Sequence, residues 1–375
     1  MKTIIYLDNA STTKPRDNVI KKMAEVAEHN FGNPSSLHTL GYNSEKEIKA
    51  ASRIISEKLN VKSGEIIFTS GGTESNNLAI LGYLKQNKRA GNKIITSSVE
   101  HPSVLNVFKH LGESGYETVY CPCDSSAGVD LDFLEKAVDE NTALVSLMNM
   151  NNEIGTISPV DRISKIIKNK NAVFHVDAVQ SFCKIPVDVS KIGCDMLSIS
   201  AHKIHGPKGV GALYIKSGVK VAPLFYGGGQ QGDLRSGTQN VEAIAGFGEA
   251  VKTGFDMEKT AALKARLVEL IIQNIDDYEI NSPGEDCSGN ILNISFPGIR
   301  SEVLLHHLSK ENIYVSSGSA CGSNKKSYVL EQMGKKPEII DSAIRFSLSD
   351  TNTVEEIDYT AAKLKEIIEK LRMEN

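Results

Sequence analysis

Short apolar runs alternate with segments of helical period over residues 65–215, and this alternation restricts the fold more than any other feature of the chain. The runs are rich in β-branched and aromatic residues, which predict strands. The helical segments between them favour parallel strand pairs, because a parallel pair needs a long crossover connection. The pattern therefore predicts an α/β fold in which helices cover a mostly parallel sheet. The expected strands are 65–69, 93–96, 118–121, 143–147, 172–176, 195–200 and 211–215, and the expected helices are 102–111, 130–138 and 160–168.

The chain outside this alternation predicts helices near the N-terminus and a second region near the C-terminus. Residues 17–30 and 44–60 have helical period, and a long helix is expected over 241–275. The 375 residues exceed the usual size of one domain, so we expect a large domain over 1–255 and a smaller α+β domain over 256–375. The N-terminal segment is expected to pack with the small domain. The small domain is expected to contain strands at 289–296, 313–316 and 343–348 and a closing helix at 354–371.

Net charge and cysteine spacing exclude several classes of protein. A formal net charge of −4 with 23% charged residues and no basic stripe argues against nucleic acid as the main ligand. The first apolar run is short and is interrupted by Asp8, so we expect neither a signal peptide nor a membrane span. We therefore expect a cytoplasmic protein. The six cysteines lack paired C-x-x-C spacing, which predicts reduced thiols and no metal site.

Polar residues follow two of the predicted strands, in the motifs H-V-D-A-V-Q and S-A-H-K. Asp177 ends one strand, Gln180 lies three residues later, and Lys203 follows the next strand in a turn rich in glycine and proline. Open α/β sheets bind ligands at the carboxyl ends of their strands. A lysine amine, a carboxylate for a pyridine nitrogen and an amide for a ring oxygen are the groups that hold pyridoxal phosphate. Taken alone, Lys203 could equally be an ordinary surface lysine beside a turn. The three residues together predict a pyridoxal-phosphate site.

A second turn fits the phosphate end of this cofactor. The motif T-S-G-G-T-E-S-N-N places Gly71 and Gly72 after a strand, where backbone N–H groups can approach an anion, and Thr73 opens a helix. Ser200 and His202, within S-A-H-K, are also placed to meet a phosphate. A Gly-Gly turn with a threonine cap is a common structural device, so this turn alone does not decide the point.

Taken together, the motifs of the chain resemble those of cysteine desulfurases of the NifS/IscS type, in the class V aminotransferase family of fold-type I pyridoxal-phosphate enzymes. The resemblance covers essentially the whole chain, and the motifs stand in the order of that family. It implies a large domain with a mostly parallel sheet of the seven-stranded type and a small C-terminal domain that carries Cys321. The matching motifs are Y-L-D-N-A-S-T-T (6–13), F-G-N-P-S-S-L-H (31–38), T-S-G-G-T-E-S-N-N (69–77), E-H-P-S (100–103), N-N-E-I-G (151–155), H-V-D-A-V-Q (175–180), S-A-H-K (200–203), G-P-K-G-V-G (206–211), R-S-G-T (235–238), S-S-G-S-A-C (316–321) and R-F-S-L (345–348).

The resemblance implies roles that the pattern alone leaves open at the cofactor. Lys203 would be the catalytic lysine that bonds to the aldehyde of pyridoxal phosphate. Thr73, Ser200 and His202 would bind the phosphate group, and Thr238 would reach it from the partner subunit. That last assignment requires a homodimer.

Further roles implied by the resemblance concern the substrate. His101, which precedes Pro102 at a predicted helix start, would stack on the cofactor ring and handle protons. Asn152 would contact the ring oxygen and the substrate, although spacing alone does not separate it from Asn151. Arg345 would clamp the substrate carboxylate through a bidentate pair, with an ordinary salt bridge at a strand end as the alternative.

One thiol would carry the remaining chemistry. Cys321 lies in S-S-G-S-A-C-G-S-N-K-K, a stretch of small and polar residues that buries little apolar surface and is expected to move. Its thiolate would attack the sulfur of bound L-cysteine, and Lys325, Lys326 or His101 would lower the pKa of the thiol. The alternative is a buried and inert cysteine, which is the commonest fate of a free cysteine.

The implied reaction converts L-cysteine to L-alanine and leaves the sulfur on Cys321 as a persulfide. A sulfur-acceptor protein, in iron–sulfur cluster assembly or in tRNA or cofactor thiolation, would then take the sulfur. A selenocysteine or cysteine lyase on the same fold, an aminotransferase, and a scaffold for iron–sulfur assembly are the alternatives.

Two departures from the family pattern leave the acceptor open. The stretch G-S-N-K-K after Cys321 is shorter than in members with a long sulfur-delivery loop, which limits how far a persulfide can travel. Gln231-Gly232-Asp233 replaces the usual Glu-Arg-Gly, so a cation is lost and an anion gained near the partner's active site. Neither departure alters Lys203 or the residues expected to hold the cofactor ring.

Overall fold

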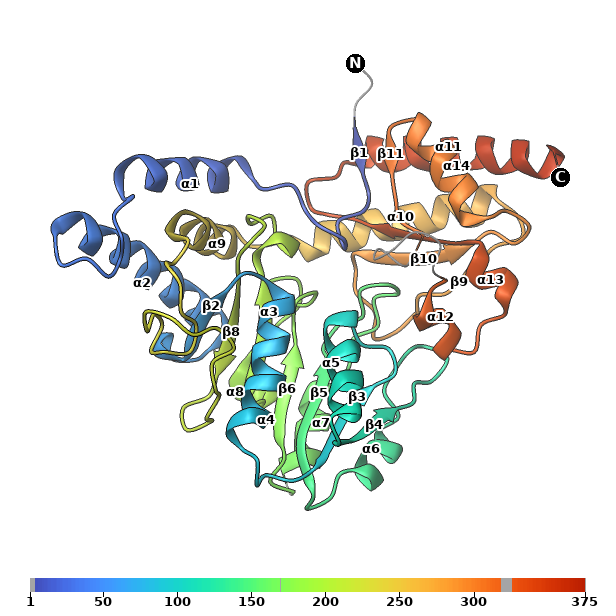
Figure 1. The fold of residues 1–375 in the computed structure, drawn as a ribbon. Coiled ribbons are helices and arrows are strands. Elements are labelled where there is room, and N and C mark those ends of the chain that lie inside the picture. Colours follow the sequence, from blue (N-terminus) through green and yellow to red (C-terminus); the bar gives the residue numbers. More distant parts are fainter. Residues whose placement is uncertain (1–3, 169, 318–325, 375) are drawn as a thin grey trace.

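A seven-stranded sheet forms the centre of the computed structural model, which describes residues 4–168, 170–317 and 326–374 (Figure 1). The sheet consists of β2 (Ile66–Thr69), β3 (Lys93–Ser97), β4 (Glu117–Cys121), β5 (Thr142–Met148), β6 (Val173–Asp177), β7 (Met196–Ser200) and β8 (Gly211–Ile215). The strand order is β2–β8–β7–β6–β5–β3–β4. β3 to β7 are mutually parallel, whereas β8 is antiparallel to both of its neighbours. The prediction of an α/β fold with a mostly parallel sheet is therefore confirmed.

Helices cover both faces of this sheet because successive strand residues point into two different hydrophobic cores. On β2, Ile66 and Phe68 belong to one core and Ile67 belongs to the other. The core that contains Ile67 also packs α4 (Tyr83–Gln86), α5 (Pro102–Glu113) and a π-helical turn (Leu78–Gly82) that follows α3 (Gly72–Asn77). The opposite core packs α1 (Asp17–His29), α2 (Thr39–Leu59), α6 (Leu131–Ala137), α7 (Val160–Lys168), α8 (Val189–Ile192) and α9 (Val241–Thr253).

The C-terminal region has a hydrophobic core of its own. Its elements are β9 (Glu279–Ile280), β10 (Ile291–Ser295), β11 (Ile313–Tyr314), β12 (Ala343–Ser347), α10 (Met257–Asn274), α11 (Ser301–Lys310), α12 (Tyr328–Gln332), α13 (Pro337–Asp341) and α14 (Val354–Glu374). β10 lies between β12 and β9, and β1 (Ile5–Tyr6) pairs in parallel with β11. Ile5 and Leu7 therefore share a core with α10, α11 and α14. The domain border at residue 255 stays a prediction.

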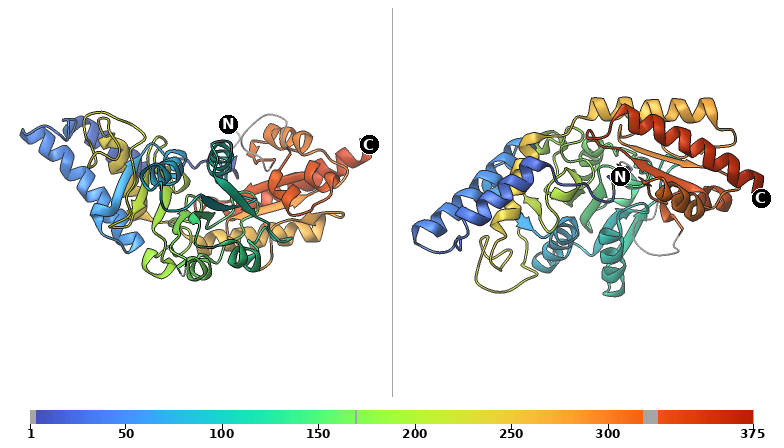
Figure 2. Two further views of the ribbon diagram at one scale, coloured as in Figure 1. Left: turned by 60° about the horizontal axis from the view of Figure 1, so that its bottom comes forward. Right: turned by 90° about the horizontal axis from the view of Figure 1, so that it is seen from above.

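The outer helices lie at opposite ends of the molecule. Figure 2 shows α1 and α2 at one end and α10 and α14 at the other, with the central sheet between them. Within the described ranges, none of the helices combines the length and the apolar character that crossing a membrane requires.

The single long helix expected over 241–275 is wrong, because the chain breaks between α9 and α10. Gly254 has a φ of 76°, a left-handed backbone conformation that suits glycine. Asp256 then caps α10, since its side chain accepts from the backbone N–H of Lys259 at 2.9 Å. The apolar period continues across the break, so the pattern did not reveal it. α2 also begins at Thr39, earlier than the periodicity indicated.

The first residue of β8, Gly211, leaves no room for a side chain. A Cβ atom there would lie 2.7 Å from the Cα of Gly71 and 2.7 Å from the carbonyl oxygen of Ile199. Gly211→Ala is therefore expected to lower the free energy of unfolding by about 1–3 kcal/mol, because backbone atoms must move. Gly64→Ala is the control, since a Cβ at Gly64 meets no atom within 4 Å. Denaturant unfolding measures both variants, and equal stability of the two would contradict this close packing.

Candidate active site

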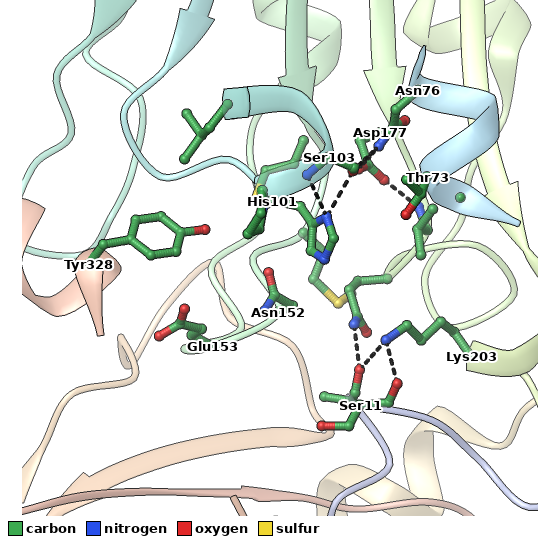
Figure 3. A pocket seen from close by; sticks show the side chains of 18 of the residues that line it. Ser11, Thr73, Asn76, His101, Ser103, Asn152, Glu153, Asp177, Lys203 and Tyr328 are labelled. Carbon is green, nitrogen blue, oxygen red and sulfur yellow. Dashed lines mark hydrogen bonds between the residues drawn. The ribbon is translucent and has the colours of Figure 1, made fainter. Parts of the chain in front are cut away.

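A cavity of about 770 Å³ opens where the parallel strands end (Figure 3). Asp177 is the last residue of β6, and Lys203 ends the short turn Ala201–Lys203 that follows β7. The N-terminal segment and β12 contribute further parts of the wall. A neighbouring cavity of about 350 Å³ shares Gly72, Thr73 and His202 with the first. The predicted site residues that line the large cavity are Thr73, His101, Asn152, Asp177, Gln180, His202, Lys203 and Arg345.

Backbone carbonyl groups of the N-terminal segment hold the amine of Lys203. Its Nζ donates to the carbonyl oxygen of Ala10 at 2.5 Å and to that of Ser11 at 2.8 Å (Figure 3). Nε2 of Gln180 donates to the same Ala10 carbonyl at 2.8 Å. The segment after β1 therefore positions both the predicted catalytic lysine and the predicted amide for the cofactor ring.

The carboxylate of Asp177 is buried and fixed by two donors. Nδ2 of Asn76 donates to its Oδ2 at 2.7 Å, and the backbone N–H of Val179 donates to its Oδ1 at 2.9 Å (Figure 3). These two hydrogen bonds fix the orientation of the carboxylate at the cavity wall. Asn76 lies on α3 within the motif T-S-G-G-T-E-S-N-N, but sequence reasoning assigned it no role. Its position one helical turn after Gly72 was the available signal.

His101 caps the N-terminus of α5, as the following proline predicted. Its Nδ1 accepts from the backbone N–H of Ser103 at 3.1 Å, so the proton of the neutral ring belongs on Nε2. Burial lowers the pKa of His101 below its usual range, and nearby Lys203 acts in the same direction while Asp177 opposes it. A neutral imidazole can act as a base at the cavity wall.

Three of the four residues predicted to bind phosphate, Thr73, Ser200 and His202, lie near the start of α3. The helix begins at Gly72 with Gly71 as its N-cap, so Thr73 is its second residue rather than its first. Oγ of Ser200 is buried and has no hydrogen-bond partner among the described atoms. Burial lowers the pKa of His202 to about 3, so this ring is neutral. A buried hydroxyl without a partner is costly unless a ligand satisfies it, and these groups fit a bound phosphate.

Asn151 and Asn152, which spacing alone did not separate, have different environments. Oδ1 of Asn151 accepts from the backbone N–H groups of Glu153 at 2.8 Å and Ile154 at 3.1 Å, and its Nδ2 donates to Val99. Asn151 thus stabilises its own turn. Asn152 lines the cavity, and its buried Oδ1 has no partner among the described atoms. Asn152 is therefore the one with capacity to bind a ligand.

The guanidinium group of Arg345 is completely buried and already engaged. Nη1 donates to the carbonyl oxygen of Asn152 at 2.9 Å, and Nη2 donates to Asp8 at 2.8 Å and to Oγ of Ser11 at 2.7 Å. Only Nε lacks a partner among the described atoms. A carboxylate that binds two nitrogens of this group would therefore compete with Asp8 and Ser11 for Nη2. Sequence reasoning missed both of these partners, although they belong to the motif Y-L-D-N-A-S-T-T.

Three predicted site residues are not among those that line the large cavity: Ser200, Thr238 and Cys321. Thr238 is exposed and lines neither cavity, so its predicted role depends on a partner subunit. Cys321 lies outside the described residues, whereas Lys326 lines the cavity. None of the described cysteines does so. Burial raises the pKa of Cys121 and Cys183 to about 12, so neither forms a thiolate readily.

Glu153 is a cavity residue that sequence reasoning missed. Oγ of Ser327 donates to its Oε2 at 2.5 Å, and Tyr328 lies beside it at the cavity wall (Figure 3). Burial raises the pKa of Glu153 to about 7, although Ser327 and Arg345 act in the opposite direction. The carboxyl group therefore changes charge near neutral pH. Its place in the motif N-N-E-I-G was the available signal.

Glu153→Gln is expected to stabilise the protein increasingly as the pH rises from 4.5 to about 7. The folded state binds the Glu153 proton more tightly than the unfolded state, so this contribution to stability is lost as the pH rises through that window. The variant has no such loss, and its advantage should reach about 3 kcal/mol and then stay constant. Denaturant unfolding at a series of pH values measures the difference. A difference that does not depend on pH would contradict the raised pKa.

Known proteins resemble this chain over nearly its whole length. The family model Aminotransferase class-V matches residues 5–360. The chain is 43% identical to "Cysteine desulfurase IscS" of Dictyoglomus turgidum, over 99% of this chain and 96% of that protein. A solved structure named "NIFS-LIKE PROTEIN" is 39% identical with a TM-score of 0.93, and covers 98% of this chain and 100% of its own. Another, "SspA in complex with cysteine", is 34% identical with a TM-score of 0.84, over 94% of this chain and 100% of its own. This chain belongs to the class-V aminotransferase family.

Proposed function

We propose that this chain is a cysteine desulfurase, which uses pyridoxal phosphate to convert L-cysteine to L-alanine and passes the sulfur to an acceptor. The observation that carries the proposal is the meeting of Lys203, Asp177, His101 and Arg345 in one cavity. The names of the relatives support the substrate, because one is called a cysteine desulfurase and another is a complex with cysteine.

The buried polar groups of the cavity fit pyridoxal phosphate. When bound, the cofactor supplies an electron sink for charge that develops at the substrate Cα. Lys203 would hold its aldehyde carbon, and Asp177 would keep a proton on its pyridine nitrogen. Gln180 would donate to its ring oxygen. The unpartnered hydroxyl of Ser200 and the start of α3 would receive its phosphate.

Proton movement at the substrate carbon falls to Lys203 and His101. Both line the same cavity, so each can approach a bound amino acid. The lowered pKa of His101 favours its neutral ring, so a proton that this ring receives is readily given up again. Lys203 would take the proton from Cα, and His101 would share in returning it.

The substrate carboxylate would bind at Arg345. The guanidinium offers Nε, which has no partner among the described residues, and movement of Ser11 would free part of Nη2. The side chain of Asn152, whose Oδ1 is also unpartnered, lies on the same wall and would contact the bound substrate. A carboxylate fixed in this way orients the sulfur of the amino acid away from the arginine.

Sulfur transfer would need the thiolate of Cys321. A sulfur–sulfur bond would form between this thiolate and the substrate sulfur, while the bond from that sulfur to Cβ breaks. The electron pair of the broken bond would stay with the carbon, which takes a proton and leaves as L-alanine. The outer sulfur of the persulfide would then pass to the acceptor, in iron–sulfur cluster assembly or in tRNA or cofactor thiolation. We place this reaction in the cytoplasm.

Mass spectrometry of the enzyme after incubation with L-cysteine tests the reaction. One sulfur atom is expected to appear on the peptide that contains Cys321, with release of L-alanine. Cys321→Ala should abolish turnover of L-cysteine, whereas Cys123→Ala, at a partly buried thiol that does not line the cavity, should retain it. Lys203→Ala should be unable to hold the cofactor covalently. A Cys321→Ala variant with full turnover would instead favour a selenocysteine or cysteine lyase.

A homodimer with shared active sites is the second part of the proposal, because Thr238 lines neither cavity of its own chain. Lys203→Ala and Thr238→Val homodimers are each expected to have low activity. A mixed dimer should regain activity, since one of its sites combines Lys203 from one subunit with Thr238 from the other. Activity measured after subunits are mixed and exchanged tests this. No recovery in dimers proved to be mixed would contradict a phosphate contact across the interface.

A further inference from the structure

A buried lysine lies beneath the proposed cofactor site without a carboxylate partner. Lys184 follows Gln180 by four residues and is only 4% exposed. No ion pair joins it to an acidic residue in the described part of the chain, and Nζ lies over the ring of Phe255, 5.9 Å from its centroid. Burying an unpaired ammonium is costly, so its presence calls for a role that an apolar residue cannot fill.

Lys184 fixes the orientation of the Gln180 amide. Its Nζ donates to Oε1 of Gln180 at 3.2 Å, while Nε2 of Gln180 donates to the carbonyl oxygen of Ala10 at 2.8 Å. If the amide flipped, Oε1 would face the Ala10 carbonyl and Nε2 would face the ammonium, and both hydrogen bonds would be lost. The NH₂ group therefore stays on the Ala10 side, where its second hydrogen is available to a ring oxygen.

The same hydrogen bonds connect Lys184 to Lys203. The Ala10 carbonyl accepts from both Gln180 and Lys203, so two lysines are linked through one amide and one carbonyl group. Burial lowers the pKa of Lys184 to about 7, and the charges of Lys203 and Arg345 act in the same direction. The charge of Lys184 also acts on Cys183, His202 and His205, and the charge of Lys203 acts on His101 and His202.

We propose that Lys184 is a positioning residue for the cofactor: its Nζ, as donor to Oε1, holds Gln180 with the amide facing the ring oxygen, and its charge, when protonated, disfavours a second proton on the nitrogen of Lys203. The proposal rests on the proposed function, because it requires pyridoxal phosphate in this cavity. A purely structural role would make Lys184 a contributor to folding alone.

Lys184→Met tests the proposal, since methionine fills a similar volume without charge or donor. The dissociation constant of the apoprotein for pyridoxal phosphate is expected to rise about tenfold, which corresponds to the loss of one hydrogen bond. The pH midpoint of the change in visible absorbance of the loaded protein should rise by about one unit, because a nearby cation is removed. Lys191→Met is the control, since this side chain is 84% exposed on α8.

Stability of the apoprotein provides a measurement that does not involve the cofactor. The pKa of Lys184 is about 7 in the folded state and 10.5 in the unfolded chain, so the folded state binds this proton more weakly. The free energy of unfolding should therefore rise as the pH increases from about 7 to 10.5. Lys184→Met should lack this pH dependence and be at least as stable near pH 7. Loss of stability with unchanged cofactor affinity would overturn the proposal in favour of a structural role.

Two further variants separate the hydrogen bond from the charge. Lys184→Gln retains a donor for Gln180, so it should keep most of the affinity while still shifting the absorbance midpoint. In a Gln180→Leu background, Lys184→Met should no longer weaken cofactor binding, because its effect passes through the amide. Unchanged affinity and an unchanged midpoint in both Lys184 variants would refute the proposal. A wild-type protein that does not bind the cofactor would instead refute the proposed function.

Discussion

The few residues that follow β1 are the constraint on which the whole cavity depends. Their backbone carbonyls hold Lys203 and Gln180, and Asp8 pairs with Arg345 at 2.8 Å. The same stretch is anchored to the C-terminal region, because Ala10 and its neighbour bond to Ser347 of β12. This segment therefore joins the sheet end to the C-terminal region, in addition to the direct bonds from Arg345 to Asn152 and from Ser327 to Glu153.

The pattern of the sequence predicted the site residues that stand directly at strand ends. Asp177 and Lys203 follow from the rule that parallel strands present their carboxyl ends at one edge of the sheet. Asn76 and Glu153 were missed, because their contacts to Asp177 and to Ser327 join segments that no local period connects. The roles of Ser200, His202 and Arg345 came from the resemblance to a family, since spacing alone left them open.

The fold was predictable where each element carries a strong period of its own. The predicted bounds of the central strands and of helices such as α5 and α7 lie within a few residues of those in the structure. The apolar face of each is long enough to give a clear period in the sequence. The break between α9 and α10 was not predicted, since one glycine and one aspartate interrupt an apolar stripe that continues on both sides. Short elements such as β9 and α12 depend on packing with distant segments, so no local sequence pattern predicts them.

The use of main-chain oxygens to hold the amine of Lys203 has a practical consequence. The contact at Ala10 is made by the main-chain carbonyl and the residue is already alanine, so an alanine scan would not test this position. Its contribution would become visible only through changes that bend the chain, such as a proline, an insertion, or an ester in place of the following amide. A mutational survey that replaces only side chains would therefore miss the main-chain groups that position Lys203 and Gln180.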